Sequence, residues 1–264
     1  MQRIAVFGGV YSNYLALERC LEDAHVRGAE AIYCLGDLGG CGPFPERVFP
    51  LLIDADVQVV QGNYDHSIGH DRDDCACGYT DPLDNYFARV SYEYTQRQTP
   101  VRWKPWLRSL PPSRRVRLGR YQLHLCHGSP RRTNEFVWES TASTAFLDRL
   151  VEQARADVAI GTHTGLHWAR RLPGRPGPDR WWINAGAIGR PANDGGTHVW
   201  YTLLDASQAE LSVQFVPLDY DHERLAAEIE AESLPAEFAE TVRTGWWTTC
   251  LEVLPMKERR RGRH

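Results

Sequence analysis

The stretch AIYCLGDLGG, residues 31–40, runs from an apolar segment into a glycine-rich polar end that contains Gly36 and Asp37. A short apolar run that stops at glycine and a polar residue is typical of a buried strand followed by a loop. The same pattern recurs at RIAVFGG (3–9), VQVVQGN (57–63), YQLHLCHGS (121–129) and DVAIGTH (157–163). Helix-like segments separate the first few runs, so the sequence predicts an α/β sheet built from these strands.

The loops after these strands carry the residues suited to chemistry. In such sheets, ligand chemistry collects at the carboxyl ends of the strands, so we expect all five loops at one rim. The rim then gathers a carboxylate, an amide and two imidazoles from Asp37, Asn63, His127 and His163. This mixed nitrogen and oxygen set suits a divalent ion such as Zn, Mn or Fe(II) rather than Ca.

Each of these four residues also has an ordinary structural interpretation. Asp37 could cap the following helix, and Asn63 could adopt the left-handed geometry of a turn. His127 and His163 could be buried, hydrogen-bonded histidines at strand ends. The four residues together, at four strand ends, favour a metal site over these separate interpretations.

The middle of the chain divides into a helical part and a β-rich part. Residues 83–110 carry a helical pattern, with Trp103 and Trp106 as anchors. β-type runs follow His163, at 167–172, 180–189, 197–205 and 210–218, and the last two are expected to form a hairpin. We therefore predict a second sheet after His163.

The end of the chain is predicted to be helical and then disordered. Two short amphipathic helices are expected within residues 219–244, and the basic tail 255–264 is expected to be disordered. We predict a single domain over residues 1–254, with a core at 1–218 and a helical extension at 219–254. The tryptophans of this extension fit either core packing or the face of a homo-oligomer.

Composition excludes several classes of protein. The 264 residues are 42% hydrophobic and 24% charged, with a formal net charge of -4, so we expect no nucleic-acid partner. No apolar run approaches the length that spans a membrane, and the start, MQRIAVFGG, does not resemble a signal peptide. We therefore expect a cytoplasmic protein without a membrane partner.

The cysteines are expected to be reduced. Their number, seven, is odd, and a chain of this size does not need disulfides for stability. Cys75 and Cys77 form the only close pair, and a zinc ribbon would require a second pair and a different spacing. We predict that they belong to a loop without a bond or a metal.

The loop motifs occur in a recognisable order. They read Gly9-Val10-Tyr11, Gly36-Asp37, Gly62-Asn63-Tyr64-Asp65, Cys126-His127-Gly128-Ser129 and Thr162-His163-Thr164-Gly165. This order resembles that of the calcineurin-like metallophosphoesterases, particularly their compact bacterial phosphodiesterase-like branch. Their motifs read Asp-x-His, Gly-Asp-x-x, Gly-Asn-His-Asp, a lone His and Gly-His-x-His. The resemblance extends to about Leu218 and implies a four-layer α/β/β/α sandwich of two mixed β-sheets flanked by helices.

The departures from the family pattern fall on one of its two metal ions. Gly9, Tyr11 and Gly165 stand where that ion has ligands of its own in the family. The ligand set of the other ion is intact, namely Asp37, Asn63, His127 and His163. The resemblance therefore implies one strong site for a divalent metal ion, Mn, Zn or Fe, with one ion per chain.

We expect hydrolysis of a small phosphorylated substrate, either a phosphomonoester or a phosphodiester. One ion can polarise a phosphoryl oxygen and lower the pKa of bound water. Tyr64 replaces the family's proton-donating histidine, and its reference pKa of about 10 makes it a poorer acid. Tyr64 and Tyr11 could still donate hydrogen bonds to a phosphoryl oxygen, and we assign Asp65 to the same catalytic group.

Three further residues are candidates at this site. We assign Asn13 and Arg131 to substrate binding, since an arginine can hold a phosphate by two hydrogen bonds, although Arg131 could equally be a solvated surface residue. His167 lies two residues beyond Gly165 and could substitute for the missing ligand. The advance of ~6.6 Å along a strand opposes a direct replacement.

Two other functions fit the same residues. The chain could be a catalytically silent relative that binds a phosphorylated ligand or a protein partner through the same rim. Alternatively, a single Asp, Asn and two-His site could support hydrolysis of a substrate without phosphate, or a redox iron.

Overall fold

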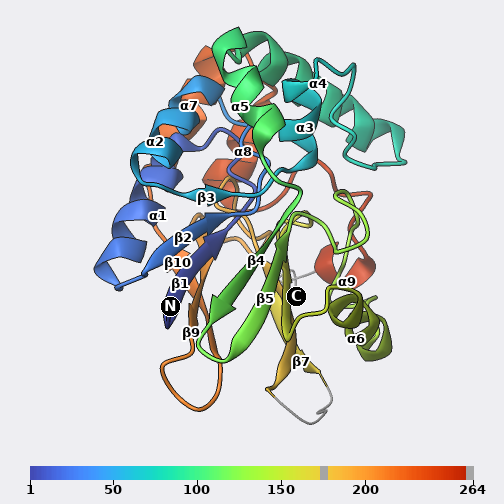
Figure 1. Cartoon of the computed structure of the whole chain (residues 1–264). Coiled ribbons are helices and arrows are strands. Elements are labelled where there is room, and N and C mark those ends of the chain that lie inside the picture. The colour runs from blue at the N-terminus through green and yellow to red at the C-terminus, as the bar shows by residue number, and fades with distance from the viewer. Residues whose placement is uncertain (173–177, 260–264) are drawn as a thin grey trace.

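The computed structural model describes residues 1–172 and 178–259, and within them two five-stranded mixed sheets lie between layers of helices (Figure 1). The first sheet has the strand order β10 (Ser212–Leu218), β9 (Val199–Asp205), β1 (Arg3–Phe7), β2 (Ala31–Cys34) and β3 (Gln58–Val59). The second has the order β4 (Ser113–Leu118), β5 (Tyr121–Cys126), β6 (Val158–Gly161), β8 (Arg180–Ala185) and β7 (His167–Leu172). The predicted four-layer α/β/β/α class is confirmed.

The prediction of one sheet followed by a second is wrong in its details. Strands β1, β2 and β3 are parallel in the first sheet, whereas β5 and β6 are parallel in the second. The predicted hairpin of β9 and β10 forms, but it joins the first sheet because β9 pairs antiparallel with β1. Strand β4 was not predicted from the sequence, and its three arginines hide the apolar alternation.

The side chains of β1 point alternately toward the second sheet and toward the outer helices. Ile4 and Val6 pack between the sheets, whereas Ala5 and Phe7 pack against helices on the outer face. All four side chains are fully buried. Burial on both faces explains the continuous apolar run of this strand.

Helices cover the outer faces of both sheets (Figure 1). The first sheet is covered mainly by α1 (Tyr14–Val26), α2 (Val48–Asp54), α7 (His222–Ala231) and α8 (Ala236–Thr244). The second sheet is covered by α6 (Thr144–Gln153) and, beside it, α9 (Met256–Arg259). The remaining helical segments are α3 (Asn63–Gly69), α4 (Pro82–Gln98), α5 (Lys104–Ser109) and the 3-10 turns η1 (Pro45–Arg47) and η2 (Val101–Trp103). No helix within the described ranges has both the length and the apolar character needed to cross a membrane.

The helical predictions are confirmed, and one prediction of disorder is not. Helices α4 and α5 cover the predicted helical part, and Trp103 packs with its ring centroid 5.2 Å from that of Phe49. Helix α9 forms inside the tail that was predicted to be disordered. It is anchored because the buried Glu258 carboxylate accepts hydrogen bonds from the Ser140 backbone N–H and hydroxyl, at 2.9 and 2.5 Å. Residues 260–264 of the predicted tail lie outside the described residues.

Candidate metal centre

Four of the predicted residues meet where strand ends from the two sheets come together. Asp37 follows β2, Asn63 begins α3 just after β3, His127 follows β5, and His163 follows β6. One ligand atom from each of Asp37, His127 and His163 lies within 4.8 Å of the others. We call Asp37, Asn63, His127 and His163 the kept half of the rim.

Two glycines bring the first two loops close enough for this meeting. A Cβ atom on Gly36 would lie 2.3 Å from the Gly62 backbone nitrogen, and one on Gly62 would lie 2.4 Å from Asp37 Oδ1. Gly36 also has a φ of +88°, in the left-handed region that glycine enters at little cost. The Gly-Asp and Gly-Asn pairs of the sequence therefore reflect the close contact of two loops at this rim.

The His127 ring presents a bare nitrogen to the centre. Its Nδ1 lies 2.7 Å from the Leu35 carbonyl oxygen, which can only accept, so Nδ1–H is the donor. In the neutral ring Nε2 then carries a lone pair. This Nε2 lies 3.2 Å from Asp37 Oδ2 and 3.0 Å from His163 Nδ1.

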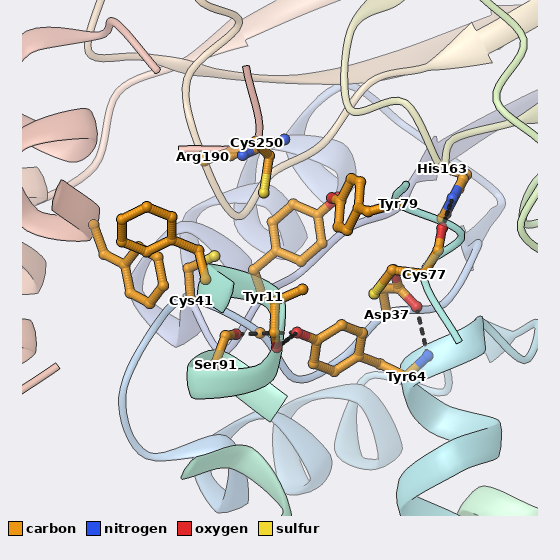
Figure 2. A pocket seen from close by; sticks show the side chains of 14 residues that line it. Tyr11, Asp37, Cys41, Tyr64, Cys77, Tyr79, Ser91, His163, Arg190 and Cys250 are labelled. Carbon is orange, nitrogen blue, oxygen red and sulfur yellow. Dashed lines mark hydrogen bonds between the residues drawn. The ribbon is translucent and has the colours of Figure 1, made fainter. Parts of the chain in front are cut away.

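His163 is oriented in the same way from the other side. Its Nε2–H donates to the Cys77 carbonyl oxygen at 3.1 Å, so the neutral ring has its lone pair on Nδ1 (Figure 2). A carboxylate oxygen and two ring nitrogens thus converge as acceptors. Acceptors repel one another unless a cation or a proton lies among them, so this arrangement fits a divalent metal ion.

Asn63, whose neighbour Tyr64 donates its backbone N–H to Asp37, offers a further buried acceptor. Its Nδ2 group donates to the Cys75 carbonyl oxygen at 2.9 Å, which fixes the orientation of the amide. Its Oδ1 atom is buried and has no hydrogen-bond partner among the described residues. Buried polar atoms without a partner are rare and costly, and a metal ion would satisfy this oxygen.

The charges on Asp37 and His127 stabilise each other. Burial opposes charge on both Asp37 and His127, but their mutual attraction lowers the pKa of Asp37 and raises that of His127. Burial and the charge on His127 lower the pKa of His163 to about 3, so this ring is neutral near pH 7. A neutral imidazole beside a carboxylate is the state that binds metals.

Asp65 holds the two ligand loops together. Its carboxylate accepts hydrogen bonds from the backbone N–H groups of Asp37 at 2.9 Å, Leu38 at 3.0 Å and Gly62 at 2.7 Å. Burial and the nearby Asp37 charge raise its pKa to about 6. These contacts give Asp65 a positioning role, whereas its predicted catalytic role stays a prediction.

Tyr64 faces away from the converging acceptors. Its hydroxyl hydrogen-bonds to Ser91 Oγ at 3.1 Å and to the Ala88 carbonyl at 3.3 Å, and its backbone N–H donates to Asp37 Oδ1 at 3.1 Å (Figure 2). Burial raises its pKa well above the usual value. The tyrosine that replaces the family's histidine therefore orients Asp37 through its backbone, and its predicted acid role stays a prediction.

Tyr11 lies in the region where the other metal's ligands are missing. Backbone hydrogen bonds place its loop, from Gly9 N–H to Gly36 O at 3.0 Å and from Tyr11 N–H to Asp37 O at 3.1 Å. A Cβ atom on Gly9 would lie 2.7 Å from Tyr11 Cζ and 2.8 Å from its hydroxyl oxygen. The phenol thus covers the position of the missing carboxylate, and burial raises its pKa, so it is neutral.

Trp247 and Arg190 complete this region. A Cβ atom on Gly165 would lie 3.6 Å from the Trp247 ring, and the Arg190 guanidinium carbon stands 3.4 Å from the centroid of that ring. The same guanidinium carbon lies 5.8 Å from the centroid of the Tyr11 ring. We call Gly9, Tyr11, Gly165, Arg190 and Trp247 the emptied half of the rim.

A small cavity of about 40 Å³ joins the two halves. Asp37 and His163 line it from the kept half, and Tyr11 and Arg190 line it from the emptied half (Figure 2). A cavity of this size has room for only a few water molecules or a small polar group.

Three predicted residues lie elsewhere. Asn13 is fully buried and caps α1, with its Oδ1 accepting from the Ala16 N–H at 3.0 Å. The exposed Arg131 forms an ion pair with Glu135. His167 does not join the metal group, because its strand places the ring 4.2 Å from that of Trp200. The substrate-binding roles of Asn13 and Arg131 stay predictions, and the substitute-ligand role of His167 is not supported.

The prediction that Cys75 and Cys77 are unbonded is wrong, because they form a disulfide. Their loop closes over the kept half, where the carbonyl groups of the two cysteines accept the hydrogen bonds from Asn63 and His163. Cysteines two positions apart can meet only where the backbone curves sharply, and Ala76 between them has a φ of +51°. The spacing alone does not reveal this curvature.

Arg190 and Trp247 were missed by the sequence analysis. Arg190 lies within the segment INAGAIGRP, whose resemblance to the family was noted without a role for the arginine. Trp247 follows α8 and was treated as part of a packing surface. No local signal connects them to the rim, since both reach it through contacts distant in sequence.

Comparison with known proteins agrees with this fold. The model of the calcineurin-like phosphoesterase superfamily domain matches residues 2–208. The crystal structure of a metallophosphoesterase from Sphaerobacter thermophilus is similar with a TM-score of 0.69 and 26% identity, covering 92% of this chain and 99% of that one. The hypothetical protein PH1004 from Pyrococcus horikoshii has the same fold, with a TM-score of 0.76 and 21% identity, covering 94% and 100%. The uncharacterized protein MJ0912 of Methanocaldococcus jannaschii is 23% identical over 253 residues, covering 92% of this chain and 98% of that one.

Proposed function

The chain belongs to the calcineurin-like phosphoesterase superfamily, and we propose that it hydrolyses a small phosphomonoester or phosphodiester with one divalent metal ion. The observation that carries this proposal is the convergence of a carboxylate and two imidazoles, whose ligand atoms lie within 4.8 Å of one another. Two ring nitrogens face each other at 3.0 Å beside a carboxylate, and the buried Asn63 amide oxygen has no hydrogen-bond partner in the described part of the chain. Mn, Zn and Fe(II) all accept this set of nitrogen and oxygen ligands.

The residues of the chain have defined tasks in this function. Asp37, Asn63, His127 and His163 would hold the ion, which when bound supplies Lewis-acid polarisation of the phosphoryl group and a more acidic water. Carbonyl groups fix the orientation of the two histidine rings, so that when both rings are neutral their facing nitrogens carry lone pairs. The neutral Tyr11 phenol lines the cavity beside Asp37 and can donate a hydrogen bond to a phosphoryl oxygen.

Metal content and turnover test the proposal together. The purified chain is expected to hold about one equivalent of metal by elemental analysis and to hydrolyse p-nitrophenyl phosphate or bis-p-nitrophenyl phosphate. His127→Ala is expected to lose the metal and at least about 100-fold of the activity. His124→Ala is the matched control, because His124 is also buried on the same stretch of chain but lies outside the metal group. Two equivalents of metal, or full activity in His127→Ala, would contradict the proposal.

A catalytically silent phosphate-binding protein is the second candidate. It is favoured by Tyr64, whose hydroxyl is engaged by Ser91 and Ala88 and does not face the centre. In this case, the chain would bind metal without turnover of either ester. The metal measurement supports the kept half in both cases, and the activity measurement separates the two.

A further inference from the structure

Arg190 is a cation whose charge is not matched by a neighbouring anion. It follows β8, and its guanidinium carbon stacks on Trp247 at 3.4 Å from the ring centroid. Its Nε atom is buried without a hydrogen-bond partner, and no ion pair joins it to a carboxylate within residues 1–172 and 178–259. Arginine remains protonated in proteins, so this side chain carries a full positive charge beside the cavity.

The aromatic contacts of Arg190 account for only part of the stability of this charge. A cation over an aromatic face gains only a modest electrostatic attraction. A partly desolvated charge is normally also paired and hydrogen-bonded, because taking it out of water is expensive. The guanidinium can therefore bind an anion, and it lines the cavity that joins the two halves.

The position of this charge matters as much as its sign. The two rings that Arg190 contacts are those that cover the missing ligand positions, Tyr11 over Gly9 and Trp247 near Gly165. The emptied half therefore carries a positive charge, and this charge belongs to a side chain of the protein and not to a bound ion. Figure 2 shows Arg190 on one side of Tyr11 and the pair Asp37 and His163 on the other.

We propose that Arg190, together with the Tyr11 phenol, forms a phosphate-binding subsite in the emptied half, which holds the phosphoryl oxygens of the substrate next to the kept half. The planar guanidinium can donate two parallel hydrogen bonds to a phosphate, whereas a lysine offers a point charge. The identity of the phosphoryl group as substrate rests on the proposed function. Binding of the anion itself rests only on the arginine, the phenol and the cavity.

The test uses inorganic phosphate and the full chain freed of metal with a chelator. Isothermal titration is expected to show phosphate binding to this metal-free protein, because the subsite has its own charge. Arg190→Met is expected to weaken it at least tenfold, and Arg190→Lys less strongly. Arg89→Met, at an exposed arginine of α4, is the matched control and is expected to bind as the unaltered chain does.

The outcomes separate this subsite from the proposed hydrolysis. Phosphate binding that depends on Arg190 supports the subsite even if the chain turns over neither nitrophenyl ester. Equal phosphate affinity in Arg190→Met and the unaltered chain, both folded by circular dichroism, would overturn it. If Arg190→Met does not fold, Arg190→Lys decides, because full affinity with lysine contradicts the two-bond geometry. The proposal would also be overturned if the unaltered metal-free chain bound no phosphate at a phosphate concentration of about 10 mM. A dissociation constant of about this size is the weakest that such a titration resolves.

Discussion

The kept half and the emptied half of the rim are built on opposite physical principles. In the kept half, a carboxylate and two imidazoles converge and a buried amide oxygen lacks a partner among the described residues, a set that suits a cation from outside. In the emptied half, the chain supplies its own cation, Arg190, stacked between aromatic rings. The comparison shows that losing ligands for a metal need not remove the positive charge from that part of the site.

Removing the carboxylate of the kept half should have the largest effect. Asp37→Asn keeps the shape of the side chain but takes away the charge that attracts both the metal and His127. Metal affinity, measured by competition with a chromogenic chelator, is expected to fall by more than about 100-fold, beyond the cost of losing an outer partner. Asp23→Asn, at a carboxylate bonded to Tyr201 on the far side of the first sheet, should retain the metal.

Removing the tie between the ligand loops should have the next largest effect. Asp65→Ala deletes the acceptor of three backbone N–H groups, so the Asp37 loop and the Gly62 loop can separate. We expect metal affinity to fall about 10- to 100-fold and the free energy of unfolding to fall by about 1–3 kcal/mol. Asp84→Asn is the control, because that buried carboxylate also accepts a backbone N–H, from Val253, but does not belong to the metal group. If Asp65→Ala leaves the metal affinity unchanged, the two loops keep their positions without the hydrogen bonds to Asp65.

Restoring one missing ligand alone should destabilise the emptied half. Gly9→Asp would put a side chain where the Tyr11 phenol lies, at a residue with a φ of +52°, so the free energy of unfolding should fall by about 1–3 kcal/mol. The double variant Gly9→Asp/Tyr11→His should recover much of this loss in urea unfolding. Equal stability of Gly9→Asp and the unaltered chain would mean that Tyr11 can move aside freely.

Reducing the disulfide should have the smallest effect. The Cys75–Cys77 bond closes the loop whose carbonyls hold Asn63 and His163, but those carbonyls remain after reduction. Metal affinity is expected to weaken by less than the ~10-fold that the loss of an outer partner costs. The variant Cys75→Ser/Cys77→Ser should not respond to reductant, and an equal response would place the effect elsewhere. Since the cytosol keeps most thiols reduced, the compartment sets the state of this bond.

The kept half could be predicted from sequence because each member is marked locally. Asp37 and His163 each follow a strand that is readable as an apolar run ending near glycine. Parallel pairing gathers such ends within one sheet, whereas β2 and β6 belong to different sheets, so pairing alone does not explain why these two residues meet. The partition of the strands between two sheets could not be read in the same way. It depends on which strand β9 pairs with, and its partner β1 lies almost 200 residues earlier in the chain.

For the emptied half, the sequence predicted only that metal ligands are missing. Gly9 and Gly165 showed that ligands were missing, but what fills the space comes from Arg190 and Trp247, whose neighbours in the sequence give no hint of it. The direction of a tyrosine hydroxyl is equally hidden. Tyr11 and Tyr64 look alike in the motifs and both line the cavity, yet the Tyr64 hydroxyl is bonded to Ser91 and Ala88.

The contact between Gly9 and Tyr11 also limits how this chain could change over successive mutations. An acid at position 9 meets the phenol, and a smaller residue at position 11 first leaves a void where the ring was packed between Gly40 and Gly189. Gly165, with a φ of +73°, adds backbone strain to the return of a histidine there. Each single step toward the family's second ligand set is therefore expected to be less stable than the present chain, so the fold opposes the recovery of that set one residue at a time.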